Sequence, residues 1–162
     1  MKLRSAAMEK YPEGVSGIDT VSRDLKSLLL NGLARPARET ILACATQCRF
    51  AAKSVVTNEG RPADRLFLLT KGFARHFYTT EEGKKFLLEW LGPGVLFGAP
   101  TILSTRSSYL TSTEMVTDSS VLVWDRTTIR GLVARYPTLL ESALLIASDY
   151  VAWHLMSDEN FS

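Results

Sequence analysis

The segment from Arg49 to Trp124 restricts the fold more than any other part of the chain. Glycines stand there at positions 60, 72, 83, 92, 94 and 98, and short apolar runs lie between them. Six runs are predicted strands: Lys53–Thr57, Arg65–Thr70, Phe73–Tyr78, Lys85–Leu91, Tyr109–Val116 and Ser120–Trp124. Short strands bounded by frequent turn signals are typical of a β-sandwich or a jelly-roll barrel. The sequence therefore predicts a mainly β protein with flanking helices, of the double-stranded β-helix (jelly-roll) type.

Two glycine-containing stretches predict tight connections between these strands. Thr79–Lys85, with the sequence TTEEGKK, is typical of a polar hairpin tip. Leu91–Gly94 has the sequence LGPG, in which the proline fixes φ and the glycines permit positive φ. We therefore expect a hairpin at the first stretch and a tight turn at the second.

The N-terminal part predicts a flexible arm followed by two short helices. Residues 1–20 contain glycines and a proline but no apolar period. Ser22 suits the N-cap of a short helix that ends near Asn31–Leu33. Pro36 is expected to open a second helix, whose apolar residues at helical spacing are Ile41, Leu42, Ala45 and Cys48.

Both cysteines of the chain, Cys44 and Cys48, fall on this second predicted helix. Their spacing of four residues would place them on one helical face. We interpret them as two small apolar side chains packed inward. The alternatives are half of a metal site or a redox pair, but no further Cys or His lies nearby in the sequence to complete a zinc site. No metal is therefore expected.

Helical periodicity returns after Trp124. Asp125 is a predicted N-cap, and the apolar residues of the helix that follows are Ile129, Leu132 and Val133. Pro137 is expected to open a last helix, over residues 136–157. This helix carries a heptad-like seam formed by Leu140, Leu144, Ala147, Val151 and either His154 or Leu155. Because further apolar residues lie off the seam, we interpret the helix as a dimerisation helix, the alternative being a helix packed only within its own chain.

Charge and hydropathy exclude several classes of protein. The 162 residues include 19 Lys and Arg and 17 Asp and Glu, well mixed, for a net charge of +2. Nothing in this balance resembles the basic surface of a self-sufficient DNA-binding domain. No apolar run approaches the roughly 18 residues that cross a bilayer, and the N-terminus lacks the apolar centre of a signal peptide. We expect a soluble, cytoplasmic protein that does not contact membranes.

Three motifs, in this order, carry a resemblance to a known family. They are Asn58–Gly72 (NEGRPADRLFLLTKG), Glu81–Gly98 (EEGKKFLLEWLGPGVLFG) and Trp124–Pro137 (WDRTTIRGLVARYP). With the order of predicted elements, they resemble the cyclic nucleotide-binding domain of the Crp/Fnr family of bacterial transcription regulators. The resemblance implies a β-roll domain over residues 21–135, a dimerisation helix over 136–157 and a tail over 158–162.

The resemblance also implies where a phosphate would bind. In members that bind cyclic nucleotides, Phe-Gly-Glu begins a short helix, and an Arg-Ser or Arg-Thr pair follows on the next strand. The helix start offers free N–H groups to the phosphate, the arginine adds a charge-assisted bond, and the glutamate accepts from the ribose 2′-hydroxyl. Here Phe97 and Gly98 remain and Pro100 suits a first helical turn, but Ala99 stands at the glutamate position.

The arginine position is changed as well. Counting back from the last predicted strand places Tyr109 and Leu110 where Arg-Ser is expected. Arg106 is the only basic residue between Gly98 and Arg126, and it falls in a polar loop. Loss of a charge-assisted contact costs about 1.5–3 kcal/mol, so ordinary cyclic AMP binding is not expected.

These changes predict a pocket for an apolar or aromatic effector, or a pocket with no effector. The alternative for its aromatic residues is simple core filling. The effector itself is unknown. The candidate pocket residues are Leu88, Phe97, Gly98, Ala99, Pro100, Arg106, Tyr109, Leu110 and Thr111, with Tyr150 and Trp153 from the last helix.

Other chemistries find little support in the residues. The family's iron–sulfur branch needs clustered N-terminal cysteines, and its haem branch needs Cys-x-His just after the phenylalanine that corresponds to Phe97; neither is present. His76 is expected to be solvent-facing or hydrogen-bonded on its strand, and His154 to flank the dimer seam. A cupin enzyme would need a cluster of histidines and a carboxylate, and no catalytic motif is visible, so we do not expect an enzyme.

The family's regulators continue from the long helix into a DNA-binding helix-turn-helix. This sequence stops at Ser162, where that segment is expected to begin. We therefore expect a homodimeric effector-sensing domain whose DNA binding depends on a helix-turn-helix not present in this chain. The alternative is a stand-alone module that acts by binding another protein.

Overall fold

The computed structural model describes residues 8–10 and 30–142, and within them the strands form two antiparallel sheets. The first sheet has the order β1-β2-β9-β4-β7 and the second has the order β3-β8-β5-β6, so the strands do not close into one barrel. The elements are β1 (Met8–Lys10), α2 (Arg35–Ala43), β2 (Thr46–Phe50), β3 (Val55–Thr57), β4 (Arg65–Lys71), β5 (Ala74–Thr79), β6 (Lys85–Leu91), β7 (Leu96–Phe97), the 3₁₀ helix η3 (Ala99–Ile102), β8 (Ser112–Met115), β9 (Ser119–Asp125) and α3 (Arg126–Arg135).

Strands β4 and β9 form the centre of the first sheet and are buried on both faces. In β4 the four consecutive residues Leu66–Leu69 are buried, and in β9 all residues before Asp125 are buried. A strand covered on both sides has no polar face, which explains the continuous apolar runs of the sequence. These two strands pair with each other over most of their length. They therefore supply side chains to two separate cores.

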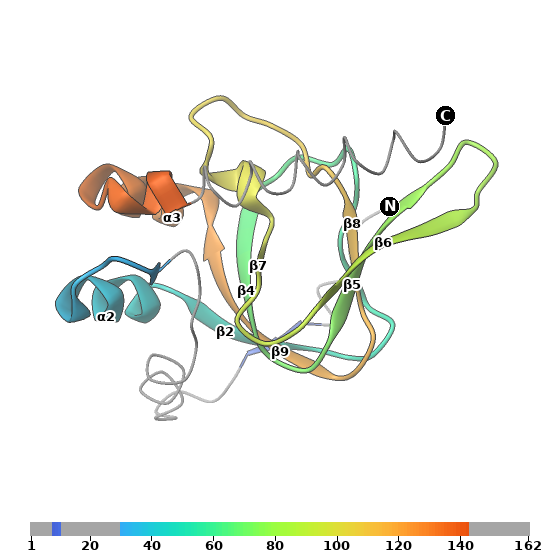
Figure 1. Cartoon of the computed structure of the whole chain (residues 1–162), viewed down its shortest axis with the longest axis horizontal. Coiled ribbons are helices and arrows are strands. Elements are labelled where there is room, and N and C mark those ends of the chain that lie inside the picture. The colour runs from blue at the N-terminus through green and yellow to red at the C-terminus, as the bar shows by residue number, and fades with distance from the viewer. Residues whose placement is uncertain (1–7, 11–29, 143–162) are drawn as a thin grey trace.

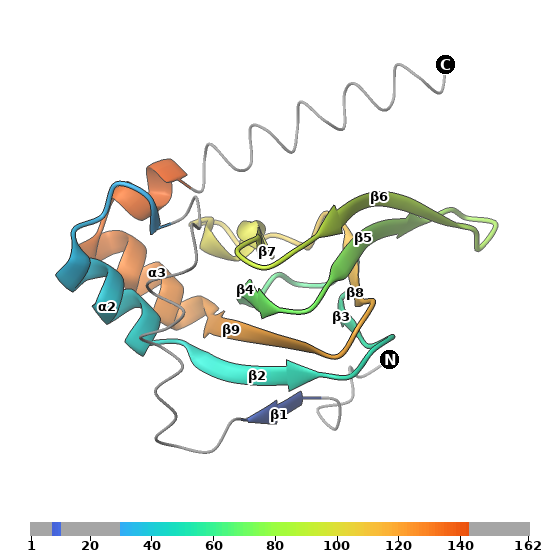
Figure 2. The same ribbon diagram turned by 60° about the horizontal axis from the view of Figure 1, so that its bottom comes forward.

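One core lies between the first sheet and the helices. Its members include Ile41 of α2, Trp124 of β9 and Ile129 of α3. Trp124 is 1% exposed, and its indole N–H donates to the carbonyl of Ile41 at 2.8 Å. This bond satisfies the only polar group of a large buried ring. Figures 1 and 2 show α2 and α3 together at one end of the molecule, with the β5–β6 hairpin extending from the opposite end.

The other core lies between the two sheets. Cys48, Phe67, Phe97, Val121 and Val123 come from the first sheet. The second sheet contributes Val56, Ala74, Leu91 and Met115. The Phe67 and Phe97 rings are stacked, with 4.7 Å between their centroids. This stack ties the short strand β7, which leads to the candidate site, to the central strand β4.

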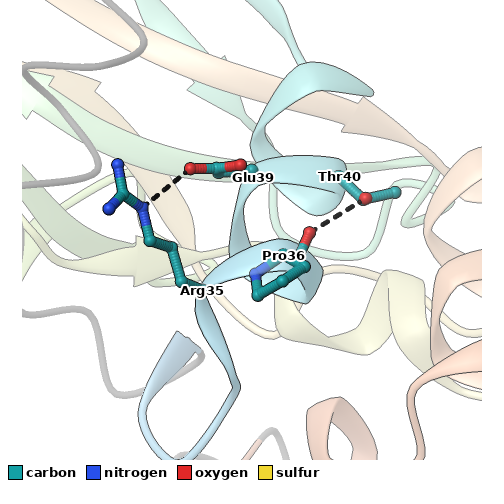
Figure 3. Close-up of polar contacts among 4 residues, drawn as sticks. All are labelled: Arg35, Pro36, Glu39 and Thr40. Carbon is teal, nitrogen blue, oxygen red and sulfur yellow. Dashed lines mark hydrogen bonds and ion pairs between the residues drawn. The ribbon is translucent and has the colours of Figure 1, made fainter.

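Helix α2 is held by its inner face rather than by its surface contacts. Its exposed side carries an ion pair between Arg35 Nε and Glu39 Oε1 at 3.0 Å, and Thr40 Oγ1 donates to the carbonyl of Pro36 at 3.0 Å (Figure 3). An exposed pair of this kind contributes only about 0.3–0.5 kcal/mol. Ile41 and Leu42, by contrast, are fully buried. The packing of these two side chains decides where the helix lies.

Helix α3 begins as the sequence predicts. The Asp125 side chain accepts a hydrogen bond from the Thr128 N–H at 2.7 Å, which makes it the N-cap, and Ile129, Leu132 and Val133 are buried. After Tyr136 the backbone becomes helical again from Thr138, and Leu139 is fully buried whereas Leu140 is 48% exposed. The rest of the predicted dimer seam, Leu144 to His154 or Leu155, lies outside the described residues. Within the described residues, no helix is long and apolar enough to cross a membrane.

The six predicted strands are confirmed as β3, β4, β5, β6, β8 and β9, with small differences at their ends. The hairpin tip is confirmed by the Thr80 N–H, which donates to the Lys84 carbonyl at 2.9 Å. The LGPG turn is confirmed by the Val95 N–H, which donates to the Gly92 carbonyl at 3.2 Å, with Gly94 at a φ of 93°. Pro93 and Gly94 therefore occupy the two central positions that favour them.

The second predicted helix is too long at its C-terminal end, and this is a correction. Helix α2 ends at Ala43, and residues 46–50 form strand β2 instead. Cys44 is exposed and Cys48 is buried on β2, so the two cysteines share no helical face and only one of them packs inward. The physical reason is the pairing of β2 with β9 at five positions, which outweighs the local apolar spacing.

Two further strands escaped prediction. Strand β7 has only two residues, too few for a period. Strand β1 takes Met8–Lys10 out of the predicted arm and pairs them with β2. The first predicted helix lies outside the described residues, apart from its end at Leu30–Leu33, where Gly32 has a φ of 82°.

Candidate functional site

The candidate site is the segment from β7 to the start of β8, residues 97–111, which we call the cassette. Phe97 ends β7, Gly98 turns the chain, and η3 forms a single 3₁₀ turn that places Thr101 and Ile102 inside the protein. A loop over residues 103–108 returns the chain to Tyr109 and Thr111, which are both buried. The cassette is therefore anchored at both ends, with an exposed loop between them.

Gly98 can be replaced by no other residue without strain. Its φ of 83° lies in the left-handed region, which residues with a Cβ seldom adopt. A Cβ on Gly98 would lie 2.6 Å from the Arg65 carbonyl oxygen and 3.4 Å from the Tyr109 ring. The backbone at this turn therefore approaches strand β4 closely, and the tyrosine ring packs directly against the turn.

The Tyr109 hydroxyl is bonded to the start of β4. It lies 3.2 Å from Asp64 Oδ1 and 3.1 Å from the Arg65 carbonyl oxygen, two acceptors that share its proton, and it accepts from the Arg65 N–H at 3.1 Å. Burial of the ring, followed by the charge of Asp64, raises the pKa of Tyr109 to about 12. The phenol is therefore neutral at ordinary pH, and its one proton is already donated to acceptors of the chain itself.

The last part of the cassette also pairs with the loop before β4. The Gly60 N–H donates to the Tyr109 carbonyl at 2.9 Å, and the Tyr109 N–H donates to the Arg61 carbonyl at 2.9 Å. The Ala63 N–H donates to the Ser107 carbonyl at 2.8 Å. These bonds are a short antiparallel pairing, so the Asn58–Gly72 motif and the cassette form one structural unit.

Two arginines of α3 hold the other end of η3. Arg126 donates through Nη1 to the Thr101 and Leu103 carbonyls, at 2.9 and 2.7 Å, and through Nη2 to the Ser104 carbonyl at 3.0 Å. Arg130 donates through Nη1 to the Ile102 carbonyl at 3.0 Å. The carbonyls at the end of a helical turn lack partners within the turn. Here the guanidinium groups of α3 supply those partners.

A polar cluster lies beside the cassette, on the inner face of the second sheet. His76 Nδ1 lies 2.9 Å from Thr113 Oγ1 and 3.3 Å from Thr111 Oγ1. Thr57 Oγ1 lies 2.8 Å from Thr113 Oγ1. His76 is 7% exposed, and its ring meets Phe97 edge-on at 6.3 Å. Of the two alternatives for His76, the hydrogen-bonded one is confirmed.

The structure brings some of the predicted pocket residues together. The Tyr109 ring packs against the Gly98 turn that follows Phe97, and Thr111 contacts His76 in the polar cluster. Ala99 and Pro100 are partly buried in the first turn of η3, and Leu88 is partly buried on β6. Arg106 and Leu110 are exposed. Tyr150 and Trp153 lie outside the described residues, so their part in a pocket stays a prediction.

The residues that bind the cassette on either side were missed in the sequence. Asp64 and Arg126 belong to the motifs that carry the family resemblance, which is the one signal that could have drawn attention to them. Nothing in the spacing indicates that Arg126 reaches η3 or that Tyr109 reaches Asp64, because 45 residues separate the latter pair. These are contacts of the folded chain, not of local sequence.

The comparisons with known proteins agree with this fold. The family model of the cyclic nucleotide-binding domain matches residues 47–136, which is more than half of the chain. This chain belongs to the cyclic nucleotide-binding domain family. No curated protein sequence matches it significantly.

Several solved structures that resemble this chain are bacterial transcription regulators. The catabolite activator protein of Thermus thermophilus is 27% identical, with a TM-score of 0.73, over 82% of this chain and 62% of that protein. The N-terminal domain of a Streptomyces coelicolor transcriptional regulator is 19% identical, with a TM-score of 0.66, over 82% and 92%. FixK2 of Bradyrhizobium japonicum is 17% identical, with a TM-score of 0.59, over 67% and 53%. The last two similarities concern the fold alone, and this chain spans less than two thirds of the Thermus protein.

Proposed function

We propose that this chain is the effector-sensing, dimerising domain of a Crp/Fnr-type transcription regulator, and that its site does not take cyclic AMP in the ordinary way. The position and hydrogen bonding of Tyr109 support the second part of this proposal, which concerns cyclic AMP. It stands at the position where the resemblance expects arginine, and its hydroxyl is bonded to Asp64 and Arg65. A phenol so engaged offers no positive charge to a phosphate.

The other cassette positions support the same conclusion. Ala99 has no group that could accept from a ribose hydroxyl, and Arg106 is exposed on the loop. The turn itself keeps the family's form, with Gly98 at positive φ and η3 after it. A retained turn without its two ionic side chains favours an effector of different chemistry, one that does not depend on a phosphate contact.

Calorimetric titration of the chain with cyclic AMP and cyclic GMP tests this proposal. We expect no binding tighter than about 10 µM, which corresponds to about −7 kcal/mol. Tighter binding of either nucleotide would show that the cassette accommodates a phosphate after all. If no heat of binding is seen, circular dichroism of the same sample serves as the control that the chain is folded.

Dimerisation is the other half of the proposal. The residues at the start of the last helix support it, because Leu139 is buried in the chain's own core whereas Leu140 beside it is 48% exposed. An apolar residue at the start of the predicted seam is therefore available to a second chain.

A charge placed in the seam should separate the two subunits. We expect Leu144→Glu and Val151→Glu to sediment as monomers, since an unpaired carboxylate is not tolerated in an apolar interface. Glu141→Gln, at an exposed position beside the seam, is the matched control and should sediment like the parent. If both glutamate variants match the parent as well, the seam does not mediate dimerisation.

A further inference from the structure

The cassette turn is small and could not hold its shape alone. Helix η3 has four residues and no side-chain cap at its N-terminus. Its own backbone bonds within the turn are those from the Thr101 N–H to Gly98 and from the Leu103 N–H to Pro100, both at 3.1 Å. A single 3₁₀ turn with so few bonds is marginal in water. Its stability must come from the groups packed against it.

On one side those groups are the guanidinium groups of α3. Together, Arg126 and Arg130 donate to four consecutive carbonyls, of residues 101–104. A guanidinium is a planar, rigid fork of donors, so several bonds from one side chain fix both position and orientation. The turn is therefore bound along its whole C-terminal end to a helix whose own position is set by the buried core.

On the other side the group is Tyr109, and Thr101 of η3 itself bonds to the same part of β4. Thr101 Oγ1 donates to the Arg65 carbonyl at 2.8 Å, the same carbonyl that the Tyr109 hydroxyl contacts. The backbone N–H of Arg126 donates to the Asp64 carbonyl at 2.8 Å, while the Asp64 carboxylate contacts Tyr109. The contacts from α3 and from Tyr109 thus meet at residues 64 and 65.

We infer that this chain closes its own cassette: Arg126, Arg130 and Tyr109 hold the turn in place without a small molecule, and the two arginines couple its position to α3. The inference rests on the proposed function and concerns the regulation of the same site. An effector would then act by displacing or reinforcing these contacts, and not by ordering a loose loop.

Hydrogen exchange followed by mass spectrometry on the full chain, with no small molecule added, tests this inference. The reporters are the amides of Thr101, Leu103 and Tyr109, and the amides of strands β2 and β9 serve as an internal reference. We expect the reporters to be protected in the parent. We expect Arg126→Gln/Arg130→Gln to raise the exchange of Thr101 and Leu103 by about tenfold or more, with the reference strands unchanged.

Two further variants keep the test decisive if the double variant loses its fold. Arg130→Gln removes a single bond and should raise the exchange of the same amides by about threefold. Arg135→Gln is the matched control, because Arg135 lies on the same helix but contacts the Tyr136 ring, and it should leave the reporters unchanged. Unprotected reporters in the parent, or equal exchange in parent and arginine variants, would overturn the inference.

A repeat of the exchange experiment with cyclic AMP in large excess separates this inference from the proposed function. If the nucleotide slows exchange of the reporters further, the proposal about cyclic AMP fails while the arginine contacts stand. If the arginine variants behave like the parent and the nucleotide has no effect, the inference fails while the proposed function stands.

Discussion

The helix-covered face of the first sheet and the cassette are stabilised by different kinds of interaction. The sheet face buries large apolar side chains such as Trp124 and Ile41, which are almost fully inaccessible. The cassette is held chiefly by side-chain bonds to backbone groups, from Thr101, Tyr109 and Arg126. Apolar burial is non-directional and contributes in proportion to area, whereas hydrogen bonds are directional and contribute about 1 kcal/mol each. Ile102 is the point where the two regions meet, because it belongs to the helix-side core.

This difference would let one region keep a family's fold while the other changes its chemistry, as we propose for the cassette. The two sheets and their cores, which we call the framework, hold the Gly98 turn through Phe97, Phe67 and the strands that carry them. None of these contacts depends on residue 99 or residue 109 carrying a charge. Neither position therefore needs a charge to place the turn, although a substitution of Tyr109 also removes one of the groups that hold it. The comparison predicts large effects of framework variants on stability and smaller, local effects of cassette variants.

The largest effect is expected for Trp124→Ala. The substitution removes a ring that is 1% exposed and leaves the Ile41 carbonyl without its indole donor. We expect a loss of about 3–5 kcal/mol in the free energy of unfolding, measured by chemical denaturation. Trp90→Ala is the matched control, because Trp90 is 58% exposed, and its cost should stay within about 0.5 kcal/mol. Equal losses for the two variants would mean that the helix-side core does not stabilise the framework.

A smaller effect is expected for Tyr109→Phe, which keeps the ring and removes the hydroxyl. At neutral pH we expect a loss of about 1 kcal/mol, because the Arg65 N–H loses its acceptor. The pH dependence is more specific. The pKa of Tyr109 is raised to about 12 in the folded chain, above its usual value near 10, because the fold favours the neutral phenol. The corresponding stabilisation, up to about 3 kcal/mol, is fully present below pH 10 and is lost as the pH rises towards 12.

Comparison with a variant that keeps the phenol isolates this contribution. Thr101→Val removes a bond to the same Arg65 carbonyl but no ionisable group. We expect the parent and Thr101→Val to lose stability in parallel between about pH 10 and 12, and Tyr109→Phe to lose distinctly less. Parallel curves for all three proteins would show that the phenol is not held in the neutral form by the fold.

Much of the fold could be predicted from the sequence because its strands are short, apolar and separated by glycines. The strands from Arg65 to Leu91 and their two turns follow directly from that pattern. Strand β2 could not be predicted, since Ala45 and Cys48 continue the helical spacing of α2, and only the pairing of β2 with β9 decides the outcome. A local apolar pattern gives no information about a contact between segments that lie some 75 residues apart in the chain.

The turn and short helix of the candidate site were predictable from the sequence, but their contacts were not. The turn at Gly98 and the changed residues Ala99 and Tyr109 are visible in the sequence. That the Tyr109 hydroxyl is bonded to Asp64, and that Arg126 binds the carbonyls after η3, depends on how distant segments pack. The proposed closure of the cassette by its own side chains depends on those long-range bonds.

The most direct measurement is a titration of cyclic AMP into the parent and into Ala99→Glu/Tyr109→Arg, which restores both ionic side chains of the nucleotide-binding pattern. If the framework is intact and only the chemistry has changed, the parent shows no binding tighter than about 10 µM, and the double variant gains at least about tenfold in affinity. Tight binding by the parent, or a double variant that folds normally and gains no affinity, would contradict the account.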